Sequence, residues 1–112
     1  MPSSVFPTEV RAPRGARFFE IGWSDGSQTR YPHRLLRGFC PCAHCQGHQG
    51  PVVFHASGDP GLLEIEEVGN YALRLLWSDG HGTGIYSFQM FRQLRELSKW
   101  PPERWRGVSL PR

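Results

Sequence analysis

Apolar and polar residues alternate along residues 17–23, which predicts a half-buried strand. Its apolar side carries Phe19, Ile21 and Trp23. The tetrapeptide Trp23-Ser24-Asp25-Gly26 then predicts a turn, because glycine reaches positive φ without steric cost. A second short strand is expected through Thr29 and Tyr31. A short helix is expected from Pro32 to about Gly38, since proline suits the first turn of a helix.

The same pattern recurs later in the chain, where Trp77-Ser78-Asp79-Gly80 repeats the tetrapeptide. Counting from the two tetrapeptides, the corresponding pairs are Phe19 and Leu73, Ile21 and Leu75, Thr29 and Thr83, and Tyr31 and Ile85. Ser87 is expected to cap a second helix, whose apolar positions are Phe88, Phe91, Leu94 and Leu97. The chain therefore contains two strand–turn–strand–helix units. Neither unit can bury its apolar face alone, so we expect an α+β fold in which both share one small, mainly antiparallel sheet with short helices packed on it.

The rest of the chain frames these two units. Residues 1–16 contain few large apolar residues and predict an irregular N-terminal arm, and residues 99–112 predict an irregular C-terminal tail with Trp100 and Trp105 at the surface or an interface. Residues 17–98 then form the folded domain. Within it, a further strand is expected over Leu62–Val68, followed by a turn at Gly69-Asn70.

Length and composition agree with one small globular domain. The chain has 112 residues, of which 38% are hydrophobic, and carries a formal charge of +3. No apolar run approaches the ~20 residues that cross a bilayer, so no membrane span is expected. The N-terminus lacks the charged and apolar regions of a signal peptide, and we expect a cytoplasmic protein. A charge of +3 gives little support for nucleic-acid binding by the C-terminal arginines.

The cysteines are the one concentrated chemical feature. All three lie in the segment Cys40-Pro41-Cys42-Ala43-His44-Cys45, too close together for a disulfide framework. Thiolates are soft ligands that suit Zn²⁺ or an iron–sulfur cluster, and short spacing lets one loop surround a single ion. Structural zinc has four ligands, so a fourth is needed.

That ligand is sought among the histidines, which are His33, His44, His48, His55 and His81. His44 is wedged between two cysteine positions, which makes simultaneous coordination awkward. His48 follows Cys45 closely and could complete a local site. His81 lies at the second tetrapeptide and could join the two units. Spacing alone leaves His48 and His81 open.

Together these motifs resemble the gamma-butyrobetaine hydroxylase-like N-terminal domain family, over about residues 19–97. The resemblance rests on three segments, Ile21-x-Trp23-Ser24-Asp25-Gly26, Tyr31-Pro32-His33-Arg34-Leu35-Leu36-Arg37 with Cys40-Pro41-Cys42-x-x-Cys45, and Trp77-Ser78-Asp79-Gly80-His81. It implies a stand-alone bacterial member of a domain of unknown function. It also implies a zinc held by Cys40, Cys42, Cys45 and His81, which favours His81 over His48.

The oxygenase activity of the hydroxylases does not follow from this resemblance. A non-haem iron site usually contains His-x-Asp/Glu, and none of the five histidines has an acidic residue two positions later. The P-loop of the ATPases to which the domain is sometimes fused is missing as well. We therefore expect a non-catalytic Cys3His zinc module that acts in protein–protein contact or as an accessory domain. The partner would be a protein, such as a P-loop ATPase or an oxygenase, or a second copy of the chain. The alternative is an iron–sulfur accessory protein that uses the same cysteines.

Overall fold

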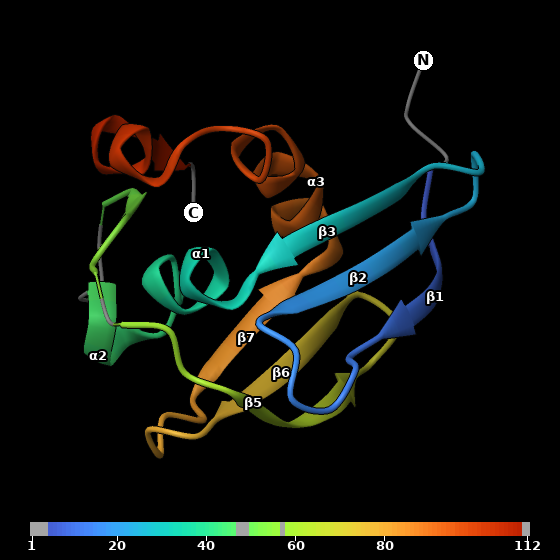
Figure 1. The fold of residues 1–112 in the computed structure, drawn as a ribbon, viewed down its shortest axis with the longest axis horizontal. Coiled ribbons are helices and arrows are strands. Elements are labelled where there is room, and N and C mark those ends of the chain that lie inside the picture. The colour runs from blue at the N-terminus through green and yellow to red at the C-terminus, as the bar shows by residue number, and fades with distance from the viewer. Residues whose placement is uncertain (1–4, 47–49, 57, 111–112) are drawn as a thin grey trace.

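The computed structural model describes residues 5–46, 50–56 and 58–110. Its strands are β1 (Pro7–Arg11), β2 (Phe18–Trp23), β3 (Gln28–Pro32), β4 (Val52–Val53), β5 (Leu62–Val68), β6 (Ala72–Trp77), β7 (Gly84–Ser87) and β8 (Ser109–Leu110). Its helices are α1 (His33–Gly38), α2 (Ala43–Gln46), α3 (Phe88–Leu97) and the 3₁₀ helix η1 (Pro102–Gly107). Figure 1 shows α1, α3 and η1 on one side of the main strands. No helix in the described part of the chain is long and apolar enough to span a membrane.

The α+β class, the antiparallel pairing and the two repeated units are confirmed, but the units do not share one sheet. β1, β2 and β3 form one three-stranded sheet, and β5, β6 and β7 form another. A third, two-stranded sheet joins β4 to β8. All of these pairs are antiparallel. The buried side chains of both three-stranded sheets belong to one apolar core cluster, so the units share a core and not a sheet.

The repeat is longer than expected, because each unit has a third strand in front of its tryptophan strand. In the first unit, Ser24 accepts a hydrogen bond from the Phe6 amide on its hydroxyl (3.1 Å) and donates its own amide to the Phe6 carbonyl (2.8 Å). In the second unit, Ser78 makes the same two contacts with Gly61 (2.8 Å each). A register shift follows in both leading strands, β1 and β5. Each unit is therefore β-β-β-α.

The first of these leading strands corrects the prediction for residues 1–16. That segment is not irregular throughout, since β1 (Pro7–Arg11) pairs with β2. Its side chains are mostly exposed, so it lacks the alternation that revealed the other strands.

The prediction of an irregular tail over residues 99–112 is also corrected. Pro101 and Pro102 begin η1, and the chain then pairs as β8 with β4. Trp105 is buried, not exposed at an interface, and its indole donates to the Leu97 carbonyl (2.8 Å). It packs edge-to-face against Phe54.

Elsewhere the helices and the second unit follow the expected pattern. α1 begins directly after Pro32. The hydroxyl of Ser87 accepts the Met90 amide (3.0 Å), so Ser87 is the N-cap of α3. β5 spans the predicted Leu62–Val68, and the turn at Gly69-Asn70 leads into β6. Trp23 and Trp77 are both buried in the core.

Two correspondences within the repeat, Tyr31 with Ile85 and Thr29 with Thr83, are wrong by a single residue. The register pairs Phe19 with Tyr31 in the first unit and Leu73 with Tyr86 in the second. The counterpart of Tyr31 is therefore Tyr86, not Ile85. By the same register, the counterpart of Thr29 is Gly84, since Ile21 pairs with Thr29 and Leu75 with Gly84. The second turn is one residue longer than the first.

The two tyrosines bind the units to each other reciprocally. Tyr31 donates its buried hydroxyl to the Phe91 carbonyl in α3 (2.7 Å), and Tyr86 donates to the Leu36 carbonyl in α1 (2.6 Å). Leu36 follows Tyr31 at the same spacing as Phe91 follows Tyr86. The ring of Phe91 also lies against both tyrosine rings. Each unit thus completes its hydrogen bonding on the helix of the other.

This exchange predicts the effect of removing either hydroxyl. Tyr31→Phe and Tyr86→Phe should each lower the free energy of unfolding by about 1–3 kcal/mol, because a buried carbonyl loses its partner. Urea denaturation followed by tryptophan fluorescence would measure the change. Tyr71→Phe is the matched control, since Tyr71 is 57% exposed, and it should leave stability unchanged. Equal stability of all three variants would contradict the reciprocal role.

Candidate metal centre

The three cysteines lie on a loop that begins where α1 ends. Phe39 caps α1, and the Cys40 amide donates to the Arg37 carbonyl (3.3 Å), so the chain turns sharply out of the helix. The carbonyl of Cys42 then accepts the amides of Cys45 (3.2 Å) and Gln46 (3.0 Å). This short helical turn, α2, brings the second and third cysteines to the same side of the loop.

Gln46 fastens the cysteine loop to the rest of the protein. Its side-chain amide donates to the Cys40 carbonyl (3.0 Å) and to the Val53 carbonyl (2.9 Å). Its side-chain oxygen accepts the Val53 amide (3.0 Å). Gln46 thus ties the start of the cysteine loop, at Cys40, to Val53 of β4. Its position in the sequence does not suggest this role.

His81 comes from the turn of the second unit, far away in sequence. The Trp77 amide donates to the His81 carbonyl (2.9 Å), and the His81 amide donates to Asp79 Oδ1 (3.1 Å). Gly80 has φ of +87°, as glycine in such a turn allows. The tight turn therefore fixes the backbone of His81 against the cysteine loop.

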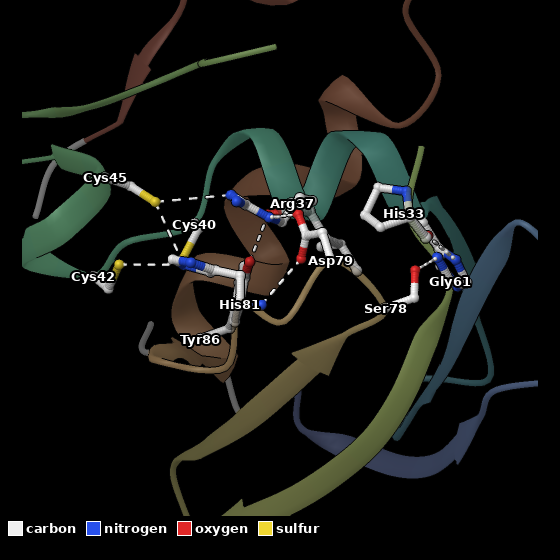
Figure 2. A network of polar contacts seen from close by, with 12 residues as sticks. His33, Arg37, Cys40, Cys42, Cys45, Gly61, Ser78, Asp79, His81 and Tyr86 are labelled. Carbon is white, nitrogen blue, oxygen red and sulfur yellow. Dashed lines mark hydrogen bonds and ion pairs between the residues drawn. The ribbon is translucent and has the colours of Figure 1, made fainter. Parts of the chain in front are cut away.

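The four side chains meet at one point (Figure 2). His81 Nε2 lies 3.0 Å from Cys40 Sγ and 3.4 Å from the Sγ atoms of both Cys42 and Cys45. All four donor atoms lie within 4.8 Å of one another. Cys40 is buried, whereas the other three side chains are partly exposed. The cluster therefore lies at the edge of the core, with Cys40 on its buried side.

The other histidines do not join this cluster as far as the structure describes them. His33 is the buried first residue of α1, and its Nδ1 lies 3.1 Å from the Pro60 carbonyl. His55 is exposed on the surface. His48, the alternative fourth ligand, lies outside the described residues, as does the side chain of His44.

The thiols differ in acidity because their surroundings differ. Burial raises the pKa of Cys40 to about 12. Burial and the neighbouring Cys42 raise the pKa of Cys45 as well. Burial opposes ionisation of Cys42 too, but hydrogen bonds, the largest from Thr83, outweigh it and lower the pKa of Cys42 to about 7. Cys42 is therefore the most acidic of the three thiols.

Gly84 makes room for the buried sulfur. A Cβ atom at this position would lie 2.6 Å from Cys40 Sγ. In the first unit the same register position holds Thr29, whose hydroxyl accepts the indole N–H of Trp23 (3.0 Å). The loss of that side chain in the second unit opens the space that Cys40 fills. Sequence reasoning missed Gly84, and the signal that reveals it is the extra residue in the second turn.

The first unit has a polar contact where the second has the cluster. Arg95 follows Tyr86 at the same spacing as Cys40 follows Tyr31. The guanidinium of Arg95 donates to the Ser27 hydroxyl (3.4 Å), and Ser27 occupies the turn position of His81. The pair Cys40–His81 therefore replaces the pair Arg95–Ser27. The centre arises from this difference between two otherwise similar corners.

Crowding at Gly84 gives a direct prediction. Gly84→Ala should lower the free energy of unfolding by about 1–3 kcal/mol, because the new methyl group overlaps the Cys40 sulfur. Chemical denaturation would measure the loss. Gly107→Ala is the control, since nothing lies within 4 Å of a Cβ at that position. A Gly84→Ala protein as stable as the control would show that the packing around Cys40 is loose.

Comparison with known proteins gives one sequence family. The model of the family described as gamma-butyrobetaine hydroxylase-like, N-terminal, matches residues 10–92. No curated protein matches the chain.

Solved structures with the same fold include a crystal structure from Acidithiobacillus ferrooxidans, of a protein with unknown function in the DUF971 family. It is 34% identical, with a TM-score of 0.65, over 80% of this chain and 91% of the other. Two solution NMR structures are 35% and 26% identical, with TM-scores of 0.67 and 0.66. They match 86% and 82% of this chain and 74% and 73% of their own.

Proposed function

The chain belongs to the gamma-butyrobetaine hydroxylase-like N-terminal family, and we propose that it is a non-catalytic module whose Cys3His centre holds one structural zinc ion. The observation that carries this proposal is the convergence of Cys40, Cys42, Cys45 and His81, whose donor atoms all lie within 4.8 Å. Three thiolates and one imidazole are a ligand set typical of structural zinc.

The distances support a single ion. Tetrahedral zinc with Zn–S near 2.3 Å and Zn–N near 2.0 Å requires about 3.5 Å between each sulfur and the nitrogen. The three separations from His81 Nε2 are 3.0, 3.4 and 3.4 Å. A small outward movement of the side chains would accommodate the ion.

An iron–sulfur cluster is the alternative occupant, and it fits these distances less well. Tetrahedral bonds of about 2.3 Å set the sulfur ligands of one zinc ion about 3.8 Å apart. The four ligands of a cluster cannot all bind the same iron, so some of them must lie further apart than they do around one ion. The short separations therefore favour one ion over a cluster.

A site with four protein ligands also favours an accessory role over catalysis. Catalytic zinc sites keep one position open for water or substrate, and structural sites do not. The 34% identical solved structure is likewise of a protein with unknown function. We propose that this chain presents its zinc-stabilised surface to another protein.

The metal content tests this proposal. Protein purified without added metal should contain one zinc per chain by elemental analysis and should be colourless. Chelation should lower the melting temperature, because metal binding stabilises the folded state. His81→Ala and Cys40→Ser should lose the zinc.

Ser27→Ala is the matched control, because Ser27 holds the same turn position in the first unit, and it should keep one zinc per chain. Full zinc retention by His81→Ala would exclude His81 as the fourth ligand. If elemental analysis instead finds iron and inorganic sulfide, and the anaerobically purified protein absorbs visible light, the occupant is an iron–sulfur cluster and not zinc.

A further inference from the structure

Arg37 lies beside the centre but is not one of its four ligands. It is on the last turn of α1, and only 13% of its side chain is exposed. Its Nε donates to Asp79 Oδ2 (3.0 Å), and its Nη1 points to Cys45 Sγ (3.8 Å). Figure 2 shows the guanidinium between the carboxylate and the sulfur. One side chain thus contacts a cysteine of the ligand loop and an aspartate of the turn that carries His81.

Asp79 extends this contact to the fourth ligand. While Oδ2 accepts from Arg37, Oδ1 accepts the backbone amide of His81 (3.1 Å). The carboxylate therefore contacts the guanidinium and the backbone of the histidine at once. A continuous path of polar contacts runs from Cys45 through Arg37 and Asp79 to His81.

We call the contact of Arg37 with both Asp79 and Cys45 the arginine bridge. The first unit shows that the turn itself forms without such a bridge. Asp25 is the counterpart of Asp79, and its Oδ1 accepts the Ser27 amide (2.9 Å) in the same way. Arg92 is the counterpart of Arg37 in its spacing from the tyrosine, yet it donates to the Val5 carbonyl (2.7 Å). In both turns the aspartate accepts the amide two residues later, but the arginine contacts both the aspartate and a sulfur only in the second. This difference ties the bridge to the centre instead of to the turn.

The positive charge of Arg37 can compensate the net charge of a metal-loaded centre. Three thiolates with one dication carry a net single negative charge in a partly buried site, which is unfavourable without a compensating positive group. A guanidinium is always charged and has a rigid fork of donors, so it can serve a carboxylate and a sulfur together. A hydrogen bond to a ligand atom also fixes the orientation of that ligand.

We propose that Arg37 is the positioning residue of the metal centre, which fixes Cys45 directly and His81 through Asp79. This inference rests on the proposed zinc site. Arg37 binds no metal itself. It raises the affinity for a dication by arranging the ligands from both units before the ion arrives and by compensating their charge.

The test compares metal binding in wild type, Arg37→Met, Arg37→Lys and Arg92→Met. Competition with a chelator measures the zinc dissociation constant, and the Co²⁺-loaded protein reports the ligand field and the thiolate-to-cobalt charge-transfer bands. Arg37→Met should weaken zinc binding by roughly 10- to 100-fold, as is usual for residues that support metal ligands. It should also shift the charge-transfer bands, because Cys45 loses its donor.

The other two variants separate position from general stability. Arg37→Lys keeps the charge and should recover part of the lost affinity. Arg92→Met removes the matching arginine of α3, so it should bind zinc like wild type even where it lowers the melting temperature. Wild-type zinc affinity and an unchanged cobalt spectrum in Arg37→Met would overturn the inference.

A second pair of variants keeps the test decisive if Arg37→Met does not fold. Asp79→Asn retains an oxygen for the His81 amide but loses the ion pair, and it should weaken zinc binding in the same range. Asp25→Asn, the equivalent change in the first turn, should not. Equal affinities in this pair would overturn the inference, whereas a wild-type protein that binds no zinc would overturn the proposed function itself.

Discussion

The reciprocal hydrogen bonds of Tyr31 and Tyr86 are the interaction on which the rest of the structure depends. Each hydroxyl reaches a helix carbonyl of the other unit, at 2.7 and 2.6 Å. A three-stranded sheet with one short helix has one apolar face and cannot bury it alone. The two units therefore fold as one body, and the tyrosines set their relative position. That position brings the end of α1 to the second turn and the end of α3 to the first.

The candidate centre is a consequence of this near-symmetry and of the places where it fails. At the first turn, Arg95 of α3 meets Ser27; at the second, Cys40 after α1 meets His81. The second turn has one more residue, and Gly84 stands where the first unit has Thr29. The longer turn and the missing side chain provide the room for a sulfur. A shared scaffold thus supplies the position, and a few local differences supply the chemistry.

Much of this arrangement could be predicted from local patterns, and the rest depends on contacts between distant residues. Alternation predicted β2 and β5, and the serine cap predicted α3, because these signals lie within a few residues. β1 is not predictable in this way, because its exposed side chains show no alternation. The identical tetrapeptides conceal the extra residue after the second one, so counting from them matches Tyr31 with Ile85 in place of Tyr86. The roles of Arg37 and Gln46 could not be predicted, since both arise from contacts across the fold.

The distribution of the four donor residues explains how an ion would act on the whole molecule. Three come from a loop that continues α1 of the first unit, and the fourth comes from the turn between β6 and β7 of the second. An ion bound by all four would link the same two units that the tyrosines hold together. Its binding free energy would therefore stabilise the packing between the units and not just the loop. Because the aromatic core is already continuous across that interface, the ion would strengthen an existing fold instead of creating one.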